Sequence, residues 1–245
     1  MKKFLLLLGI LPGLAMAAHP LVSDDTGNQG TDKWQYEMNT DLGTYETSGS
    51  NTTVRQVNAT ITYGMTDDLD IALNLPWLGM APAGMLSTSG IGDASIIAKW
   101  RIYDRDGLSW ALKPQINFAT GDASQGLGNG KAGAGINGLM TFISGQWTVL
   151  GNIGTTWNNN SFGARITRWN FSTAAIFSPS DELKLAIDMG TYQNADQINN
   201  VNPAFVLLGV IWSPNTALDI DLGIKHGLND SEVKRSVGAG ITLHF

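Results

Sequence analysis

The chain of 245 residues contains no cysteine, which excludes disulfide bonds, thiolate nucleophiles and zinc sites with cysteine ligands. Beyond its first residues it also lacks any run of about 20 apolar residues, the length that a membrane-spanning helix needs. Charged residues make up only 15% of the chain, and acidic residues outnumber basic ones, 21 against 15. An acidic chain of this kind is not expected to bind nucleic acid.

The first residues have the pattern of a secretory signal peptide. Two lysines precede an apolar run, 4–11, and small residues stand two apart at Ala15 and Ala17, which predicts cleavage after Ala17. A buried amino-terminal helix is the alternative, and Pro12 disfavours it. Removal of residues 1–17 leaves 13 basic against 21 acidic residues, a net charge of −8.

The last ten residues, 236–245, alternate between apolar and polar or small side chains. Successive side chains of a strand point to opposite faces, so this stretch predicts a strand with one apolar and one polar face. The strand ends on the aromatic Phe245, which is typical of the closing strand of a bacterial outer-membrane barrel.

Stretches with the same alternation recur along the chain. Short turns and longer glycine-rich loops connect them alternately. The expected strands are 33–41, 56–63, 69–77, 93–102, 108–118, 131–142, 146–157, 166–177, 182–192, 204–212, 217–227 and 236–245. Residues 78–90 and 119–130 are expected to be long loops. The pattern predicts an all-β fold over residues 33–245, a transmembrane antiparallel β-barrel of about 12 strands with both termini in the periplasm. Residues 18–32 are polar and without period, so they form a periplasmic lead-in or a small plug, or else a disordered terminus.

All eight tryptophans fall in the apolar phase of these strands, and most stand near a strand end. Because the indole ring is amphipathic, this placement predicts aromatic girdles at the two membrane interfaces. The girdle consists of Trp34, Trp77, Trp100, Trp110, Trp147, Trp157, Trp169 and Trp212.

The opposite phase carries charges of both signs and is expected to line the lumen. The predicted lining residues are Glu37, Asp41, Asp70, Asp93, Lys99, Arg101, Lys113, Arg168, Lys184, Asp188, Phe205, Leu207, Asp219, Asp221 and Lys225. Several inward positions in the second half are glycine or apolar. Such a mixed wall favours an amphipathic or apolar solute over a highly charged one. Alternatively, the glycines serve strand curvature and the apolar residues pack against a plug.

A lipid hydrolase of the outer membrane would need an outward histidine and serine near the outer rim. His226 is the one histidine with that phase, but Ser236 has inward phase and Ser231 falls in a loop. We therefore expect no enzyme, and no catalytic residue, cofactor or metal site is assigned.

Four stretches carry a resemblance to a known family. Residues 18–30 (AHPLVSDDTGNQG), 64–77 (GMTDDLDIALNLPW), 90–101 (GIGDASIIAKWR) and 119–122 (ATGD) resemble the outer-membrane transporters grouped with the MetA-pathway phenol-degradation proteins. Where that family pattern has a proline before Thr-Gly-Asp, this chain has Ala119. The resemblance implies uptake of hydrophobic or aromatic compounds and carries over no binding residue.

The sequence thus predicts an outer-membrane channel for passive uptake of a small solute, acting as a monomer without a cofactor. Its expected partners are outer-membrane lipids, the small-molecule solute and the barrel-assembly machinery, for which Phe245 is the terminal assembly signal. A closed structural barrel that interacts with the envelope is the alternative.

Overall fold

The alternating stretches form long antiparallel strands. The computed structural model describes residues 19–47, 50–84 and 86–245, and within them thirteen strands and one short helix occur. They are β1 (Trp34–Thr47), β2 (Ser50–Thr66), β3 (Leu69–Pro82), β4 (Thr88–Ile91), β5 (Ser95–Arg105), β6 (Leu108–Asn117), η1 (Ala123–Gln125), β7 (Gly133–Ser144), β8 (Trp147–Trp157), β9 (Thr167–Phe177), β10 (Leu183–Tyr192), β11 (Ala204–Asn215), β12 (Leu218–Gly227) and β13 (Arg235–His244). No helix in this part of the chain is long and apolar enough to cross a membrane. The predicted signal peptide, residues 1–17, lies outside the described residues.

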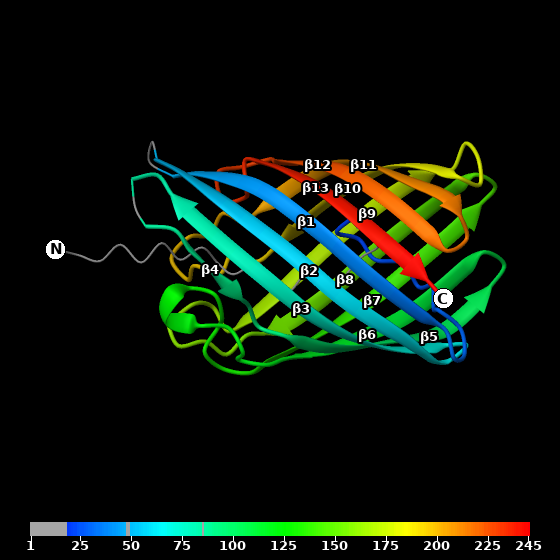
Figure 1. Ribbon diagram of the computed structural model, residues 1–245, viewed down its shortest axis with the longest axis horizontal. Coiled ribbons are helices and arrows are strands. Elements are labelled where there is room, and N and C mark those ends of the chain that lie inside the picture. The colour runs from blue at the N-terminus through cyan, green and yellow to red at the C-terminus, as the bar shows by residue number, and fades with distance from the viewer. Residues whose placement is uncertain (1–18, 48–49, 85) are drawn as a thin grey trace.

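The sheet closes on itself because the first strand, β1, pairs with the last, β13, and β2 pairs with both β1 and β3 (Figure 1). β4 and β5 share one position in the wall, since both pair with β3, β4 along residues 77–80 and β5 along residues 69–74. The wall is therefore a closed antiparallel barrel of twelve strands, as predicted.

The predicted loop at 78–90 is wrong for most of its length. β3 continues to Pro82, and β4 occupies Thr88–Ile91. The outer part of β3 is poor in alternating apolar residues, so its sequence gives no strand signal. Its backbone nevertheless finds partners on β2, which is longer than expected and stays in register with β3 as far as Thr52 and Pro82.

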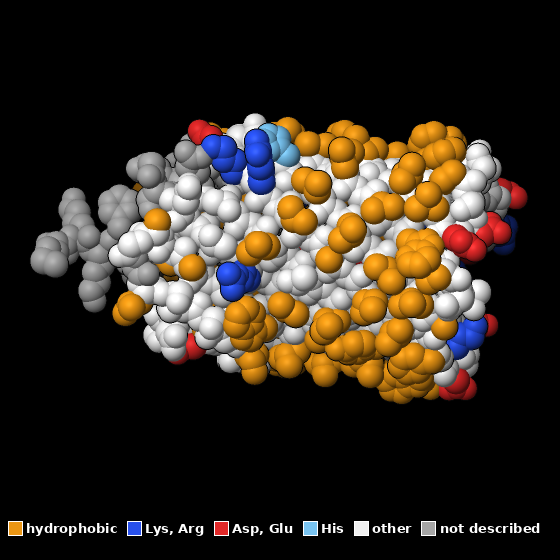
Figure 2. Space-filling view, turned by 45° about the horizontal axis from the view of Figure 1, so that its top comes forward, with side chains coloured by type: hydrophobic (Ala, Val, Ile, Leu, Met, Phe, Trp, Pro, Cys, Tyr) orange, Lys and Arg blue, Asp and Glu red, His pale blue; other side chains and the backbone are white. Residues whose placement is uncertain are grey.

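One strand shows how the two faces of the wall differ. On β10, Leu185, Ile187 and Met189 are 41–48% exposed, whereas Ala186 and Asp188 on the other face are 7% and 0% exposed. The outward side chains of the other strands are likewise largely apolar, and they form a broad band on the face that Figure 2 shows. A barrel whose outer surface is a broad apolar band and whose interior is polar has the arrangement that a lipid bilayer requires.

The two ends of the barrel differ in the length of their connections. At one end short turns join neighbouring strands, and Asp106 and Gly107 there have positive φ (54° and 78°), as a tight hairpin turn needs. The opposite end carries the longer connections, including residues 118–132 with η1 (Figure 1). Phe245 lies at the short-turn end, where its backbone exchanges hydrogen bonds with Trp34 (2.6 and 2.9 Å).

Every tryptophan side chain faces outward, with 39–58% of its surface exposed. Trp34, Trp100, Trp110, Trp147 and Trp212 belong to the short-turn half, and Trp77, Trp157 and Trp169 to the loop half. Trp34 packs on Tyr63, and Trp147 packs on Phe177, with ring centroids 4.6 and 4.9 Å apart. Their role as a membrane-interface girdle stays a prediction.

Candidate functional site

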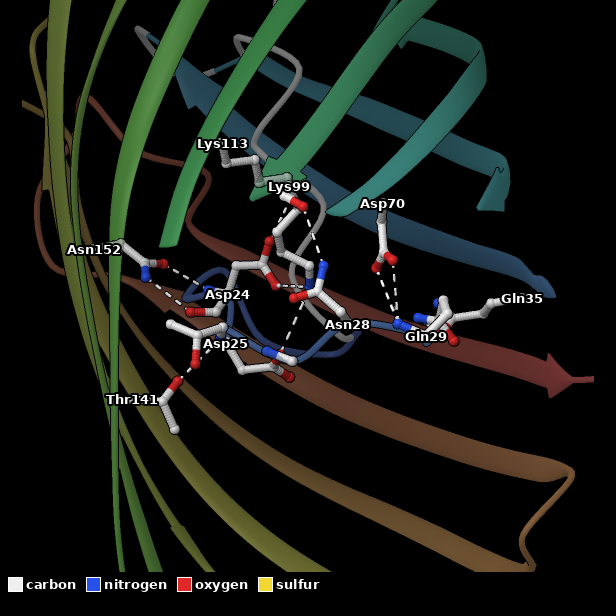
Figure 3. Close-up of polar contacts among 12 residues, drawn as sticks. Asp24, Asp25, Asn28, Gln29, Gln35, Asp70, Lys99, Lys113, Thr141 and Asn152 are labelled. Carbon is white, nitrogen blue, oxygen red and sulfur yellow. Dashed lines mark hydrogen bonds and ion pairs between the residues drawn. The ribbon is translucent and has the colours of Figure 1, made fainter. Parts of the chain in front are cut away.

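Residues 19–32, which we call the inner segment, lie inside the barrel and run round its wall (Figure 3). The segment has no strand or helix, so its backbone N–H groups need partners outside a hydrogen-bond ladder. Side chains of the wall supply many of them. The segment meets the wall at all twelve strand positions, at Gln35, Gly64, Asp70, Lys99, Lys113, Thr141, Asn152, Ser172, Asp188, Gly209, Asp221 and Gly238.

The segment begins at His19, which stands between two acidic side chains of the wall. Its Nδ1 contacts Asp221 on β12, and its Nε2 lies 3.8 Å from Oδ2 of Asp41 on β1. Burial lowers the pKa of His19, but Asp221 and Asp41 outweigh that effect and raise the pKa to about 9. His19 is therefore a cation at neutral pH and ties the segment to both strands.

Inward glycines make room for the first two residues of the segment. A Cβ at Gly209 or Gly223 would lie 2.6 or 2.5 Å from ring atoms of Pro20. At Gly238 and Gly240 a Cβ would lie 2.8 and 2.9 Å from the imidazole nitrogens of His19. In the sequence, the inward glycines indicated a wall of small residues or strand curvature, and neither explanation included this close contact with the segment.

Leu21 packs against the apolar part of the inner wall. It belongs to a buried cluster formed by Leu21, Leu150, Ala174, Ala186, Phe205 and Leu207. The predicted lining residues Phe205 and Leu207 thus face inward but are covered by the segment, with 2% and 5% of their surfaces exposed. This contact removes apolar surface from water, and the segment supplies the side chain that covers it.

Asp188 on β10 anchors the next two residues. Its carboxylate accepts hydrogen bonds from the backbone N–H groups of Val22 (2.6 Å) and Ser23 (2.7 Å) and from the Ser23 hydroxyl (2.8 Å). The Ser23 hydroxyl also donates to Oγ of Ser172 on β9 (2.9 Å). Three donors on one buried carboxylate replace the water that the charge loses inside the barrel.

Asp24 forms the centre of an ion-pair cluster with two lysines of the opposite wall (Figure 3). Its carboxylate contacts Lys113 Nζ and lies 3.6 Å from Lys99 Nζ, which is also 3.6 Å from Oδ1 of Asp25. Asp24 and Lys113 are 2% and 3% exposed. The backbone of Asp24 exchanges two hydrogen bonds with the amide of Asn152, at 2.5 and 2.8 Å.

The segment leaves the lumen at the short-turn end. The backbone N–H of Gln29 donates to both carboxylate oxygens of Asp70, at 3.1 and 3.2 Å. Thr31 donates its hydroxyl and backbone N–H to Asp67 in the β2–β3 turn, and these bonds lower the pKa of Asp67. A Cβ at Gly64 would lie 1.9 Å from the carbonyl oxygen of Gly30, so only glycine fits at this crossing.

Some predicted lining residues contact turns, loops or strand ends at either end of the barrel instead of meeting the segment. Arg101 binds Asp68 (2.9 Å) in a turn, and Asp93 accepts the backbone N–H groups of Gly121 (3.0 Å) and Asn129 (2.7 Å) in a loop. Asp219 accepts from His244 Nε2 (3.0 Å). Three others are placed as follows: Glu37 is buried and binds Asn39, Lys184 is half-buried, and Lys225 pairs with Glu232.

Sequence reasoning missed several residues that matter in this interior. Asn152 and Ser172 have inward strand phase, so their position was predictable, but nothing in the sequence shows that the inner segment needs them. Glu232 gives no signal, because it lies in the loop between β12 and β13, where no period exists. It is nonetheless 2% exposed.

The arrangement around His226 does not assemble a catalytic pair. His226 is exposed on the outward face, where it stands opposite Arg235. Ser236 is buried, and Ser231 hydrogen-bonds with Asn199 (3.2 Å). Among the described residues, no group of three or more His, Asp or Glu side chains is placed to hold a metal ion.

The closed twelve-stranded wall, its apolar outer band and its polar interior define a β-barrel of the bacterial outer membrane. Residues 20–245 match the family described as "Putative MetA-pathway of phenol degradation". The chain belongs to this family, which confirms the resemblance seen in the sequence. No curated protein matches the chain in sequence.

Solved structures share the fold at low sequence identity. An outer membrane channel from Pseudomonas putida F1 is 16% identical, with a TM-score of 0.75 over 90% of this chain and 98% of that one. The KdgM porin is 4% identical, with a TM-score of 0.59 over 87% and 99% of the two chains. The CymD monoaromatic hydrocarbon channel is 9% identical, with a TM-score of 0.51 over 89% and 90%.

Proposed function

We propose that this protein admits small, apolar or aromatic compounds passively through its lumen. The observation that carries the proposal is the inner wall, which combines an apolar cluster around Leu21 with ion pairs of both signs. Because charges of a single sign do not line the wall, it disfavours polyanions and polycations. Its apolar side chains can contact apolar molecules. The family's description and the printed name of the CymD channel point to the same class of solute.

Passage requires the inner segment to yield. Most of its contacts are hydrogen bonds and ion pairs, which water can replace when a solute enters. The proposal includes no catalytic step, since His226 has no nucleophile beside it among the described residues. It also takes the protein to be a monomer surrounded by outer-membrane lipids and inserted by the barrel-assembly machinery.

Entry of N-phenyl-1-naphthylamine, an apolar aromatic probe that an intact outer membrane excludes, tests this function. Cells that express the protein should take up the probe several times faster than cells that express a matched closed barrel. Equal rates would sink the channel function and leave the closed structural barrel.

A reversible lock tests the movement of the segment. Ser23 and Ser172 have hydroxyl oxygens 2.9 Å apart, and the chain has no other cysteine to interfere. In the variant Ser23→Cys with Ser172→Cys, oxidation should link the segment to β9 and slow probe entry, and dithiothreitol should restore it. Ser23→Cys alone is the control and should not respond to oxidation. A locked protein that passes the probe at the full rate would show that the segment stays in place during uptake.

Assembly is tested at the other end of the chain. If Phe245, which is 67% exposed at the barrel rim, is the assembly signal, Phe245→Ala should lower the amount of heat-modifiable barrel in the outer membrane. Phe177→Ala, another aromatic residue at the short-turn end, is the control for the loss of a ring.

A further inference from the structure

Among the described residues, Arg168 at the loop end of the lumen has no ion-pair partner. It is the second residue of β9 and is 5% exposed. Its Nε is buried without a hydrogen-bond partner. Neighbouring Thr155 and Thr156 bond only to the backbone carbonyl of Arg168, at 3.3 Å.

Glu232, the buried acidic residue described in this region, is engaged through one carboxylate oxygen, whereas its Oε2 is buried without a hydrogen-bond partner. Glu232 accepts from Lys225 Nζ (3.3 Å) and from the backbone N–H of Val233 (2.9 Å). Tyr192 on β10 interacts with both Glu232 and Arg168. Glu232 thus balances Lys225, and within the described part of the chain no carboxylate pairs with the guanidinium of Arg168.

Aromatic rings surround these charges. Tyr192 is 8% exposed, Tyr45 interacts with Glu232 and Tyr192, and the ring of Phe205 lies 5.5 Å from Lys225 Nζ. We call Arg168, Tyr192, Tyr45, Glu232, Lys225 and Phe205 the outer cluster. It is built from β1, β9, β10, β11, β12 and the β12–β13 loop, on the loop side of the inner segment.

A buried guanidinium is costly without an anion. Arginine does not lose its proton in proteins, so burial cannot neutralise it as it can neutralise a lysine. A water molecule would satisfy Nε but would not supply the missing negative charge. A wall that keeps this charge unpaired beside aromatic rings has the features of a site for an anion that arrives from outside.

We propose that the outer cluster is a subsite for an aromatic monocarboxylate, with Arg168 holding the carboxylate. This inference rests on the proposed function and names one class of its solutes. The planar guanidinium offers two parallel N–H donors, which match a carboxylate. Tyr192 and Tyr45 supply the rings that face an aryl group.

The deeper lumen limits the charge of the ligand to one. Asp188, Asp221 and Asp70 lie along the inner segment and are 0–2% exposed. Their contacts with the segment hold them in place, and they would repel a second carboxylate. A sugar acid with several charges is therefore a poor fit, and a molecule of the size of benzoate is a good one.

Benzoate binding to the detergent-folded full chain tests the subsite, with benzamide as the neutral molecule of the same shape. Wild-type protein should bind benzoate, and Arg168→Gln should weaken this binding at least about tenfold, the value expected for a lost charged hydrogen bond. Arg168→Lys should recover part of it. Arg165→Gln is the matched control, because Arg165 lies three residues away and donates to the backbone carbonyl of Asn194 (3.2 Å).

The outcomes are distinct. Equal benzoate affinity in wild type and Arg168→Gln, with both variants heat-modifiable and therefore folded, would overturn the subsite. Equal affinity for acetate and benzoate would overturn its aromatic part, and equal affinity for benzamide would overturn the role of the charge. N-phenyl-1-naphthylamine entry separates the two proposals: normal entry in a protein that binds no benzoate refutes the subsite alone, whereas no entry refutes the channel.

Discussion

The outer and inner faces of the same strands follow different rules. On β10 the outward Leu185, Ile187 and Met189 meet no specific partner, and any apolar side chain serves a lipid-facing position. The inward Asp188 meets two N–H groups and a hydroxyl of the inner segment at defined distances. Composition is thus enough to specify the outer face, whereas the inner face depends on individual atoms.

The difference between the two faces in their sensitivity to substitution should be largest at the ion pair of Asp24 and Lys113. Lys113→Leu leaves a carboxylate buried without its main partner, so the free energy of unfolding should fall by about 3–5 kcal/mol. Urea unfolding, followed by heat-modifiable gel mobility, measures this. The double variant with Asp24→Leu removes both charges and should recover most of the loss. A double variant as unstable as the single one would show that Asp24 is not what makes Lys113 necessary.

The contact of His19 with Asp221 and Asp41 should make the stability of the protein fall at alkaline pH. Because folding raises the pKa of His19 from 6.5 to about 9, its stabilisation is complete below pH 6.5 and disappears as the pH rises through 9. The effect is up to about 3 kcal/mol. Unfolding measured from pH 6 to pH 10 should show a decline that is missing in His19→Gln. An identical decline in that variant would assign it to other groups.

Replacing an inward glycine with a larger residue should affect the protein only by displacing the inner segment. Gly223→Val places a Cβ 2.5 Å from Pro20, so Pro20 must move, at a cost of about 1–3 kcal/mol. The displaced segment should raise the ion conductance of the protein in planar bilayers. Leu222→Val, one residue away on the outer face, is the control and should leave conductance unchanged. Unchanged conductance in Gly223→Val would mean that Pro20 does not obstruct the lumen.

The smallest effect is expected on the lipid-facing side. Ile187→Val should cost about 1 kcal/mol or less and leave probe entry unchanged, because a methyl group facing lipid has no specific partner. The adjacent inward change Asp188→Asn keeps the shape but removes the charge, and it should loosen Val22 and Ser23. Equal effects of the two changes on probe entry would remove the distinction between the faces.

The barrel itself could be predicted from the sequence because strand alternation is a local signal. The twelve positions, the outward tryptophans and the closing strand 236–245 all follow from the period of two between apolar residues. Prediction failed along residues 78–82 and 88–90, where glycine and other small residues hide the period and pairing with β2 and β3 decides the structure.

The contacts inside the barrel could be identified only from the tertiary structure. In the sequence, glycine at 209, 223, 238 and 240 indicated small wall residues or strand curvature, and only the position of His19 and Pro20 reveals their close contact with the segment. Likewise, inward phase placed Arg168 in the lumen, but the lack of a partner depends on where Glu232 folds in from its loop. The sequence by itself therefore determined which side chains face lipid and which face the lumen. The tertiary structure decided which of the inward charges are paired, because that depends on contacts between segments up to about 200 residues apart.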